Sequence, residues 1–265
     1  MAPIEAQDSN LRTMIGRLRI LIVGRRNAGK TTILRKVCDT ADNPEIYDTN
    51  GKKIKDDEVK ATIERGNHNI RQAMVFKSKP EFVFHDSCGF EGGSKAEFEE
   101  MKQFISEHVD ARRLEERIHA IWYCISMDDR SRTIQKSEEK FFIECNTGRI
   151  PVIVVFTKFA ELNSVAYGKN KKQLEGLSKE EWSRKITEHV EELFTNTGVL
   201  DRLNDPKNRT RPKSHVRLED MTEPNANCNN LLESTTFALD DEELRLCLVS
   251  TQQSNLELCI KCAVA

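Results

Sequence analysis

Apolar residues along the chain gather into short runs of strand length, separated by longer stretches in which apolar positions recur at helical spacing. Three of the six runs are apolar almost throughout, which is typical of strands buried on both faces of a sheet. The six expected strands are residues 18–24, 73–77, 82–84, 118–126, 151–156 and 245–250.

Amphipathic stretches fill the intervals between these runs. In the stretch 178–197, Trp182, Ile186 and Val190 recur every four residues and are expected to face the sheet. The expected helices are residues 30–38, 95–110, 130–146, 178–197, 228–238 and 253–264. Strands that alternate with helices specify a parallel sheet covered on both sides. The pattern therefore predicts an α/β fold of three layers, with a mostly parallel six-stranded sheet, one antiparallel strand and helices on both faces.

Polar stretches interrupt this alternation in three places. Residues 1–16 are expected to form a flexible arm, and residues 39–70 a long irregular connection of the kind that is often functional. Residues 199–227 are polar and basic, and too poor in apolar residues to form a core, so we expect an insert within a single domain that spans 17–265. The insert is either a solvated loop or a grip for an acidic partner or a membrane surface.

The composition excludes several classes of function. Of the 265 residues, 38% are hydrophobic and 32% charged, and the net charge of −2 argues against non-specific binding to nucleic acid. No stretch reaches the roughly 18–20 apolar residues of a membrane span. The pair Cys259 and Cys262 forms a lone CxxC that lacks the other ligands of a zinc site. Because there is no signal peptide, we expect reduced thiols and a cytoplasmic protein.

The sequence GRRNAGKT at 24–31 follows the first expected strand and fits the pattern GxxxxGK[ST] at every fixed position. Gly24 and Gly29 allow the backbone to curl so that successive N–H groups face phosphate oxygens, and the helix dipole adds positive charge there. Lys30 is expected to reach the β- and γ-phosphates, and the Thr31 hydroxyl to bind magnesium. The candidate phosphate-binding residues are Gly24, Arg25, Asn27, Ala28, Gly29, Lys30, Thr31 and Thr32.

A second phosphate-side sequence, DxxG, comes at the end of a strand. Asp86 is expected to hold magnesium through a water molecule, and the Gly89 N–H to contact the γ-phosphate. A threonine in the long polar connection is expected to complete the magnesium shell. Thr62 is favoured for this role, with Thr40 and Thr49 as alternatives. The expected metal ligands are Thr31, Thr62 and Asp86.

In their order along the chain, GxxxxGKT, the switch threonine, HDSCGFEGG, FTKF and VST resemble the motifs of the Ras-like G domain. The runs ERGNHNI, FVFHDSCGFEGG, IHAIWYCI, PVIVVFTKF and LVSTQQSNLELCI are similar to those of fungal G-domain proteins on the septin and immunity-associated-GTPase side of that superfamily. The likeness extends over nearly the whole chain. It implies a P-loop G domain that binds GTP or GDP with Mg²⁺, and hydrolyses GTP slowly between two switch conformations.

The resemblance also implies where the base is recognised. G domains carry [NT]KxD after the fifth strand, and here Thr157 would brace the P-loop while the Lys158 stem lies along the base. The fourth position is Ala160, which lacks the carboxylate that accepts the N1 and N2 protons of guanine. Glu161, one residue later, is a candidate substitute.

A further base contact is expected at the end of the last apolar run. Ser250 and Thr251 follow it and resemble a SAK-type loop, whose backbone N–H receives the guanine oxygen. Alone this likeness is weak, and its value depends on the strand that is expected to precede it.

The hydrolytic machinery departs from the Ras-like pattern. A glutamine directly after DxxG orients the attacking water in that family, but this chain has Phe90 there, followed by Glu91. Glu91 and His68 are candidates for the role, although His68 also suits a solvated loop. Arg25 and Arg26 are further candidates, as charge stabilisers, although exposed P-loop arginines more often face solvent or a partner. The candidate catalytic residues are Lys30, Thr62, Gly89 and Glu91.

Three functional hypotheses follow from these motifs. The first is a slow GTPase switch that binds a guanine nucleotide, with its rate raised by a homodimer formed through the nucleotide face or by a GTPase-activating partner. The second is a nucleotide-binding scaffold with little turnover or relaxed choice between ATP and GTP. The third, an ATP-directed enzyme such as a kinase, is disfavoured because the sequence has no arginine-rich lid and no acceptor site.

Overall fold

A mixed β-sheet forms the middle layer of the protein. The computed structural model describes residues 17–55, 69–87, 95–128, 134–174, 177–223 and 225–251, which contain a seven-stranded sheet in the order β2-β3-β4-β1-β5-β6-β7. The strands are β1 (Leu18–Gly24), β2 (Glu45–Tyr47), β3 (Ala73–Phe76), β4 (Lys79–Asp86), β5 (Ala120–Ser126), β6 (Val152–Thr157) and β7 (Ser214–Arg217). Strand β3 runs antiparallel to both of its neighbours, β2 and β4, and every other neighbouring pair in this sheet is parallel.

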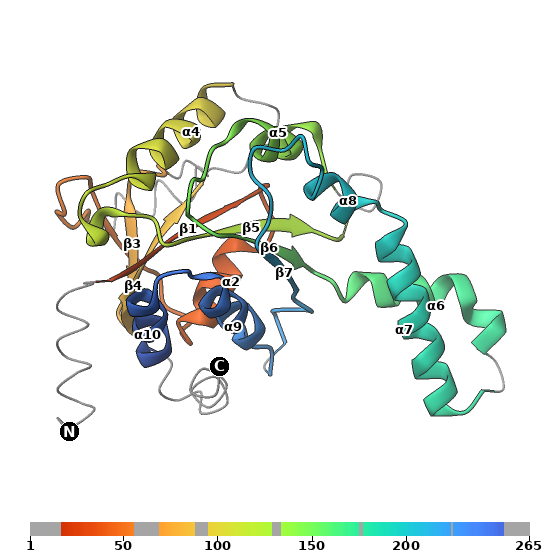
Figure 1. Ribbon diagram of the computed structural model, residues 1–265. Helices are drawn as coiled ribbons and strands as arrows, with labels where there is room; N and C mark the ends of the chain where they lie inside the picture. The colour runs from red at the N-terminus through yellow and green to blue at the C-terminus, as the bar shows by residue number, and fades with distance from the viewer. Residues whose placement is uncertain are drawn as a thin grey trace.

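Helices cover both faces of the sheet, as Figure 1 shows. One face carries α2 (Lys30–Val37), α9 (Asn229–Ala238) and α10 (Glu242–Thr251). The other face carries α4 (Lys95–Val109), α5 (Lys136–Glu144), α6 (Glu161–Leu174), α7 (Lys179–Thr195) and α8 (Val199–Leu203). A single 3₁₀ turn, η1 (Leu114–Glu116), precedes β5 in the described part of the chain. The predicted three-layer α/β architecture is confirmed.

Strand β5 shows why the central strands are apolar throughout. Because side chains alternate between the two faces of a sheet, Tyr123 and Ile125 enter the core under α5, whereas Trp122 and Cys124 enter the core under α9. All four side chains are fully buried. A strand covered on both faces therefore has no position at which a polar residue would be solvated.

The apolar run at 245–250 is not a strand, because it lies within the helix α10. Leu244 and Leu248, four residues apart, are buried, whereas Leu246 between them is 49% exposed. Four-residue spacing of buried positions is helical. The prediction of a sixth strand there was wrong.

Two strands of the sheet lack an apolar run. In β2 only Ile46 is buried, and in β7 only Val216. Both are edge strands of the sheet, where the requirement for apolar side chains on two faces is relaxed. The polar stretch 199–227, expected to be an insert, contains α8 and this edge strand β7.

Helices α6 and α7 form a hairpin that projects from the body of the domain (Figure 1). Helix α7 begins with a capping box between Ser178 and Glu181, and only its later apolar positions pack on the core. Trp182 was expected to face the sheet, but it is 37% exposed and lies against Tyr167 of α6, with ring centroids 6.0 Å apart. The helical spacing of the apolar residues was predicted correctly, but the first part of α7 does not pack on the core.

Some sequence expectations lie outside the described residues, namely the arm at 1–16, the helix at 253–264 and the CxxC pair. Within the described ranges, no helix combines the length and apolar character needed to cross a membrane.

Candidate nucleotide-binding site

The P-loop joins the end of β1 to the start of α2. Gly24 has φ 154°, and a Cβ placed on it would lie 2.6 Å from the carbonyl oxygen of Cys124 in β5. No larger residue fits this close approach of two backbones. Asn27 and Gly29 both have left-handed backbone conformations, with φ 61° and 79°. Such alternation turns successive N–H groups toward one side, which suits an anion.

Lys30 is the charged group of this loop. Its side chain is buried, and its Nζ donates to the carbonyl oxygens of Gly24 and Arg25, at 3.1 Å each. The same nitrogen lies 3.9 Å from Asp86 Oδ1 at the end of β4. The ammonium group is thus held inside the loop by two backbone carbonyl oxygens.

Arg25 does not face solvent, in contrast to the expectation for P-loop arginines. It is 8% exposed, and its Nε lies 3.2 Å from Oε1 of Glu138 in α5, although without hydrogen-bond geometry. Its guanidinium also donates to the Ser126 carbonyl at 3.4 Å. Burial raises the pKa of the Glu138 carboxyl group. The Gln135 N–H and the positive charge of Arg25 act in the opposite direction. Arg25 therefore fastens the P-loop to α5, whereas Arg26 is exposed.

Residues with oxygen donors suited to magnesium lie beside the P-loop. Asp86 ends β4 and is buried, and Thr31 lies exposed in the first turn of α2. In the described ranges, no three His, Cys, Asp or Glu side chains form a metal-binding group. Mg²⁺ in a nucleotide site does not need such a group, because one or two protein oxygens share it with phosphates and water. The donor set therefore fits this ion.

Several expected switch residues cannot be placed. Thr62, His68, Gly89, Phe90 and Glu91 lie outside the described residues. Of the alternatives to Thr62, Thr40 uses its hydroxyl to accept the Asp42 N–H at 3.1 Å, as part of a turn after α2.

The residues that were expected to contact the base begin where β6 ends. Thr157 is 2% exposed, and its Oγ1 is buried with no hydrogen-bond partner among the described residues. Lys158 has a left-handed backbone with φ 53°, and its Nζ lies 2.5 Å from Asp128 Oδ2. Thr157 lies beside the P-loop, since a Cβ placed on Gly29 would be 3.9 Å from the threonine Cβ.

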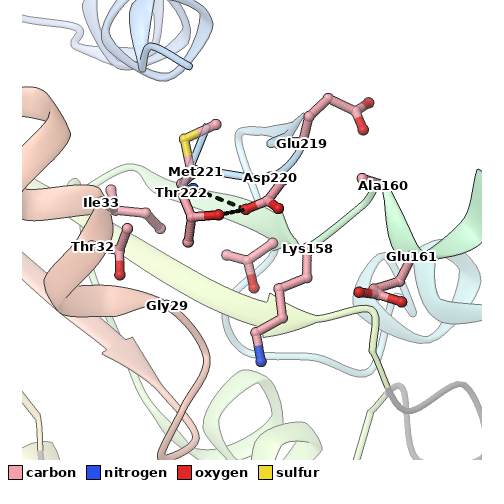
Figure 2. A pocket seen from close by; sticks show the side chains of 11 residues that line it. Gly29, Thr32, Ile33, Lys158, Ala160, Glu161, Glu219, Asp220, Met221 and Thr222 are labelled. Atoms are coloured by element: carbon pink, nitrogen blue, oxygen red, sulfur yellow. Dashed lines mark hydrogen bonds between the residues drawn. The ribbon is translucent and has the colours of Figure 1, made fainter. Parts of the chain in front are cut away.

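A cavity of about 210 Å³ separates these residues from a turn that the sequence analysis missed. Its described lining comes from the start of α2, the end of β6 with the turn into α6, and the turn after β7, as Figure 2 shows. The lining residues are Gly29, Thr32, Ile33, Thr157, Lys158, Ala160, Glu161, Glu219, Asp220, Met221 and Thr222. One of the segments that line this cavity is therefore the turn after β7.

Ser250 and Thr251 lie in the last turn of the helix α10. Their expected contact with the base depended on a strand that does not exist, so it loses its basis. The sequence signal for the turn after β7 was small. In the sequence DMT, an aspartate precedes a threonine by two residues, as in an Asx turn.

Arg217, the last residue of β7, ties this loop to the rest of the site. Its guanidinium lies over two rings, 4.8 Å from the centroid of Phe159 and 4.4 Å from that of Phe194. It also pairs with Glu191 of α7. Next to it, the Leu218 carbonyl accepts the Phe159 N–H at 3.0 Å. Two of the three chain segments that line the cavity are thus held together by backbone and side-chain contacts.

Arg19 of β1 is bracketed by two buried histidines. Its guanidinium lies 2.6 Å from His85 Nε2, whose Nδ1 faces the Ile70 carbonyl at 2.8 Å. Its backbone N–H donates to His119 Nδ1 at 2.8 Å. Burial lowers the pKa of His85 to about 3 and that of His119 to about 4. His85 also packs on Phe104, with ring centroids 4.9 Å apart.

These features define a P-loop α/β domain with its phosphate loop between β1 and α2. Residues 19–158 match the model of the family described as "50S ribosome-binding GTPase". The match covers more than half of the 265 residues, and the chain belongs to this family.

Comparison with solved structures and curated proteins adds less. One solved structure, a GDP-bound point mutant of the S. thermophilus FeoB G-domain, is 14% identical with a TM-score of 0.31. The similarity covers 57% of this chain and 51% of that one, so it spans about half of the neighbour. No curated protein matches the chain.

Proposed function

We propose that this protein binds GTP together with Mg²⁺ and acts as a slow GTPase switch. The P-loop carries the proposal, because its left-handed residues and buried Lys30 form a phosphate-binding geometry at a helix N-terminus. Membership of a GTPase family supports the same conclusion.

Each part of the loop has a distinct task in this proposal. Backbone N–H groups between Gly24 and Thr32 would bind the phosphate oxygens, and Lys30 would neutralise the β- and γ-phosphates. Thr31 and Asp86 would hold the magnesium ion. When bound, that ion neutralises the charge that develops on the transferred phosphoryl group.

Competitive binding of GTP, GDP and ATP, each with and without Mg²⁺, tests the proposal. We expect GTP to bind most tightly, and its affinity to fall when magnesium is removed. Absence of binding by all three nucleotides would refute a P-loop function. Equal affinity for GTP and ATP would leave phosphate binding intact but contradict the guanine assignment.

Turnover is the part of the proposal that depends on partners. With Phe90 in the usual position of the water-orienting glutamine, the intrinsic rate should be low. We propose that a second copy docked on the nucleotide face, or an activating partner, raises it. Single-turnover hydrolysis measured over a range of protein concentrations tests the dimer. A rate that stays constant from dilute to concentrated protein would contradict it.

A second candidate function is a nucleotide-binding scaffold with relaxed base choice. Ala160 favours this candidate, because it removes the carboxylate that a G domain places at the base edge. Tight binding with similar affinity for several bases and no measurable hydrolysis would establish the scaffold. The likeness to septins and immunity-associated GTPases stays a prediction.

A further inference from the structure

The turn after β7 brings a carboxylate into the base cavity from a place that the usual motif does not use. Three of the residues described around this cavity are acidic, namely Glu161, Glu219 and Asp220. In Figure 2, the Glu219 carboxylate points away from the other labelled side chains. The Asp220 carboxylate is drawn between Thr222 and the chain that carries Lys158 and Ala160.

Asp220 is held in one orientation before any ligand arrives. Its Oδ1 accepts two hydrogen bonds from Thr222, one from the backbone N–H at 2.9 Å and one from the hydroxyl at 2.6 Å. These bonds hold the pKa of Asp220 below its usual range, so the carboxylate is ionised at neutral pH. Both bonds end on Oδ1, which leaves Oδ2 for a further donor.

The buried Thr157 hydroxyl is an independent sign that this cavity holds a polar ligand. Its Oγ1 has no partner in the described part of the chain, and a buried polar group without a partner is unfavourable. Thr157 lines the same cavity as Asp220. A ligand that carries both donors and acceptors on its edge would satisfy the two residues together.

An ionised carboxylate accepts hydrogen bonds and donates none. Guanine presents two adjacent donors on its pairing edge, the N1–H and the 2-amino group. Adenine presents one amino group beside an unprotonated ring nitrogen, which a carboxylate would repel. An acidic reader therefore selects guanine over adenine.

We propose that Asp220 supplies the base-reading carboxylate that Ala160 lacks, so that the site reads guanine from the turn after β7. This inference rests on the proposed nucleotide binding and deepens it, because it names the group that sets base choice. The position differs from that of the expected substitute, Glu161, which opens α6.

The test compares nucleotides that differ at one position of the base. Affinities for the triphosphates of guanosine, inosine, xanthosine and adenosine are measured with the wild type and with Asp220→Asn. Inosine lacks the 2-amino group, and xanthosine carries an oxygen there. Glu219→Gln is the matched control, because it removes one acidic charge from the lining of the same cavity, and Glu161→Gln tests the rival carboxylate.

In the wild type, we expect guanosine triphosphate to bind about tenfold more tightly than inosine triphosphate, which corresponds to about 1.4 kcal/mol. The triphosphates of xanthosine and adenosine should bind more weakly still. The amide introduced by D220N can donate to the xanthine oxygen, so this variant should favour xanthosine over guanosine. The amide oxygen can still accept from Thr222, which preserves the turn. E219Q and E161Q should keep the wild-type ranking.

The outcomes separate this inference from the function on which it rests. If the wild type binds no triphosphate, the proposed function fails and the inference with it. If the wild type binds triphosphates but D220N leaves their ranking unchanged, Asp220 is not the reader and phosphate binding stands. If E161Q inverts the ranking instead, the carboxylate at the start of α6 is the reader, and the inference is overturned.

Discussion

The two ends of the candidate nucleotide site are built in different ways. The phosphate end is one continuous loop, in which buried Lys30 and left-handed Asn27 and Gly29 lie within four residues of each other. The base end combines three segments that are far apart in sequence, and its carboxylates at Glu161 and Asp220 are exposed. Phosphate recognition depends on backbone geometry, whereas base recognition depends on which side chains the fold brings together.

The difference teaches where substitutions should act. A change at the phosphate end should weaken every nucleotide by the same factor, because all share the triphosphate. A change at the base end should alter the ranking among nucleotides and leave phosphate binding in place. The predictions below use this contrast, starting with the largest effect.

Lys30→Ala should lower the affinity for GTP and ATP alike by about 100-fold. The loss combines charge-assisted hydrogen bonds worth about 1.5–3 kcal/mol each, and about 1.4 kcal/mol is tenfold. Isothermal titration of both nucleotides measures it. Lys77→Ala is the control, since the Lys77 side chain is 77% exposed, and it should bind as the wild type does. A loss confined to one nucleotide would break the contrast between the two ends.

Glu138→Gln should lower the free energy of unfolding by about 3 kcal/mol, because it leaves the buried Arg25 without its carboxylate. Urea denaturation measures the change. Glu139→Gln is the matched control, because Glu139 is a partly exposed neighbour paired with Arg202, and it should cost less than about 1 kcal/mol.

The double variant R25M/E138Q completes this test. Removing both members of a buried pair is less costly than removing one, so the double variant should recover much of the lost stability. Strictly additive losses would show that the pair does not fasten the P-loop to α5.

Acidic pH should destabilise the whole fold through His119. This effect limits the pH range in which the phosphate end and the base end of the candidate site can be compared by nucleotide affinity. The pKa of His119 is lowered to about 4 by burial, against about 6.5 when unfolded. Between these values the unfolded chain binds the extra proton, so stability falls as pH decreases, by about 1.4 kcal/mol per pH unit.

Denaturation of the wild type and His119→Gln at pH 7, 6, 5 and 4.5 checks this sign. The variant has no imidazole at this position, so the stability difference between the two proteins should shrink as the pH falls. A difference that stays constant would show that His119 keeps an ordinary pKa. Nucleotide affinities should therefore be measured above about pH 6.5, where protonation of His119 does not alter the stability of the fold.

Asp128→Asn should have the smallest effect. The Lys158–Asp128 pair is partly exposed, and such pairs contribute about 0.2–1 kcal/mol. We expect a stability change below about 1 kcal/mol and an unchanged ranking of nucleotides. A change in ranking would show that Asp128 acts on the base through Lys158, and would add a fourth segment to the base end.

The sequence by itself determined the phosphate end and most of the layers. GRRNAGKT fixes a local backbone shape, because its glycines and its lysine act within one turn of chain. The apolar runs at β1, β5 and β6 reveal strands buried on both faces, because such strands need apolar side chains at nearly every position. Those features can be predicted from the sequence because residues that are adjacent along the chain form them.

Only the tertiary structure decided the base end. The run at 245–250 has the composition of a strand, but the buried positions Leu244 and Leu248 lie on one side of a helix. Edge strand β7 shows little apolar pattern, yet its pairing with β6 brings Asp220 to the same cavity as Thr157. Sequence patterns report the burial of a segment and not its neighbours, so a pocket made by strands distant in sequence becomes visible only when the sheet order is known.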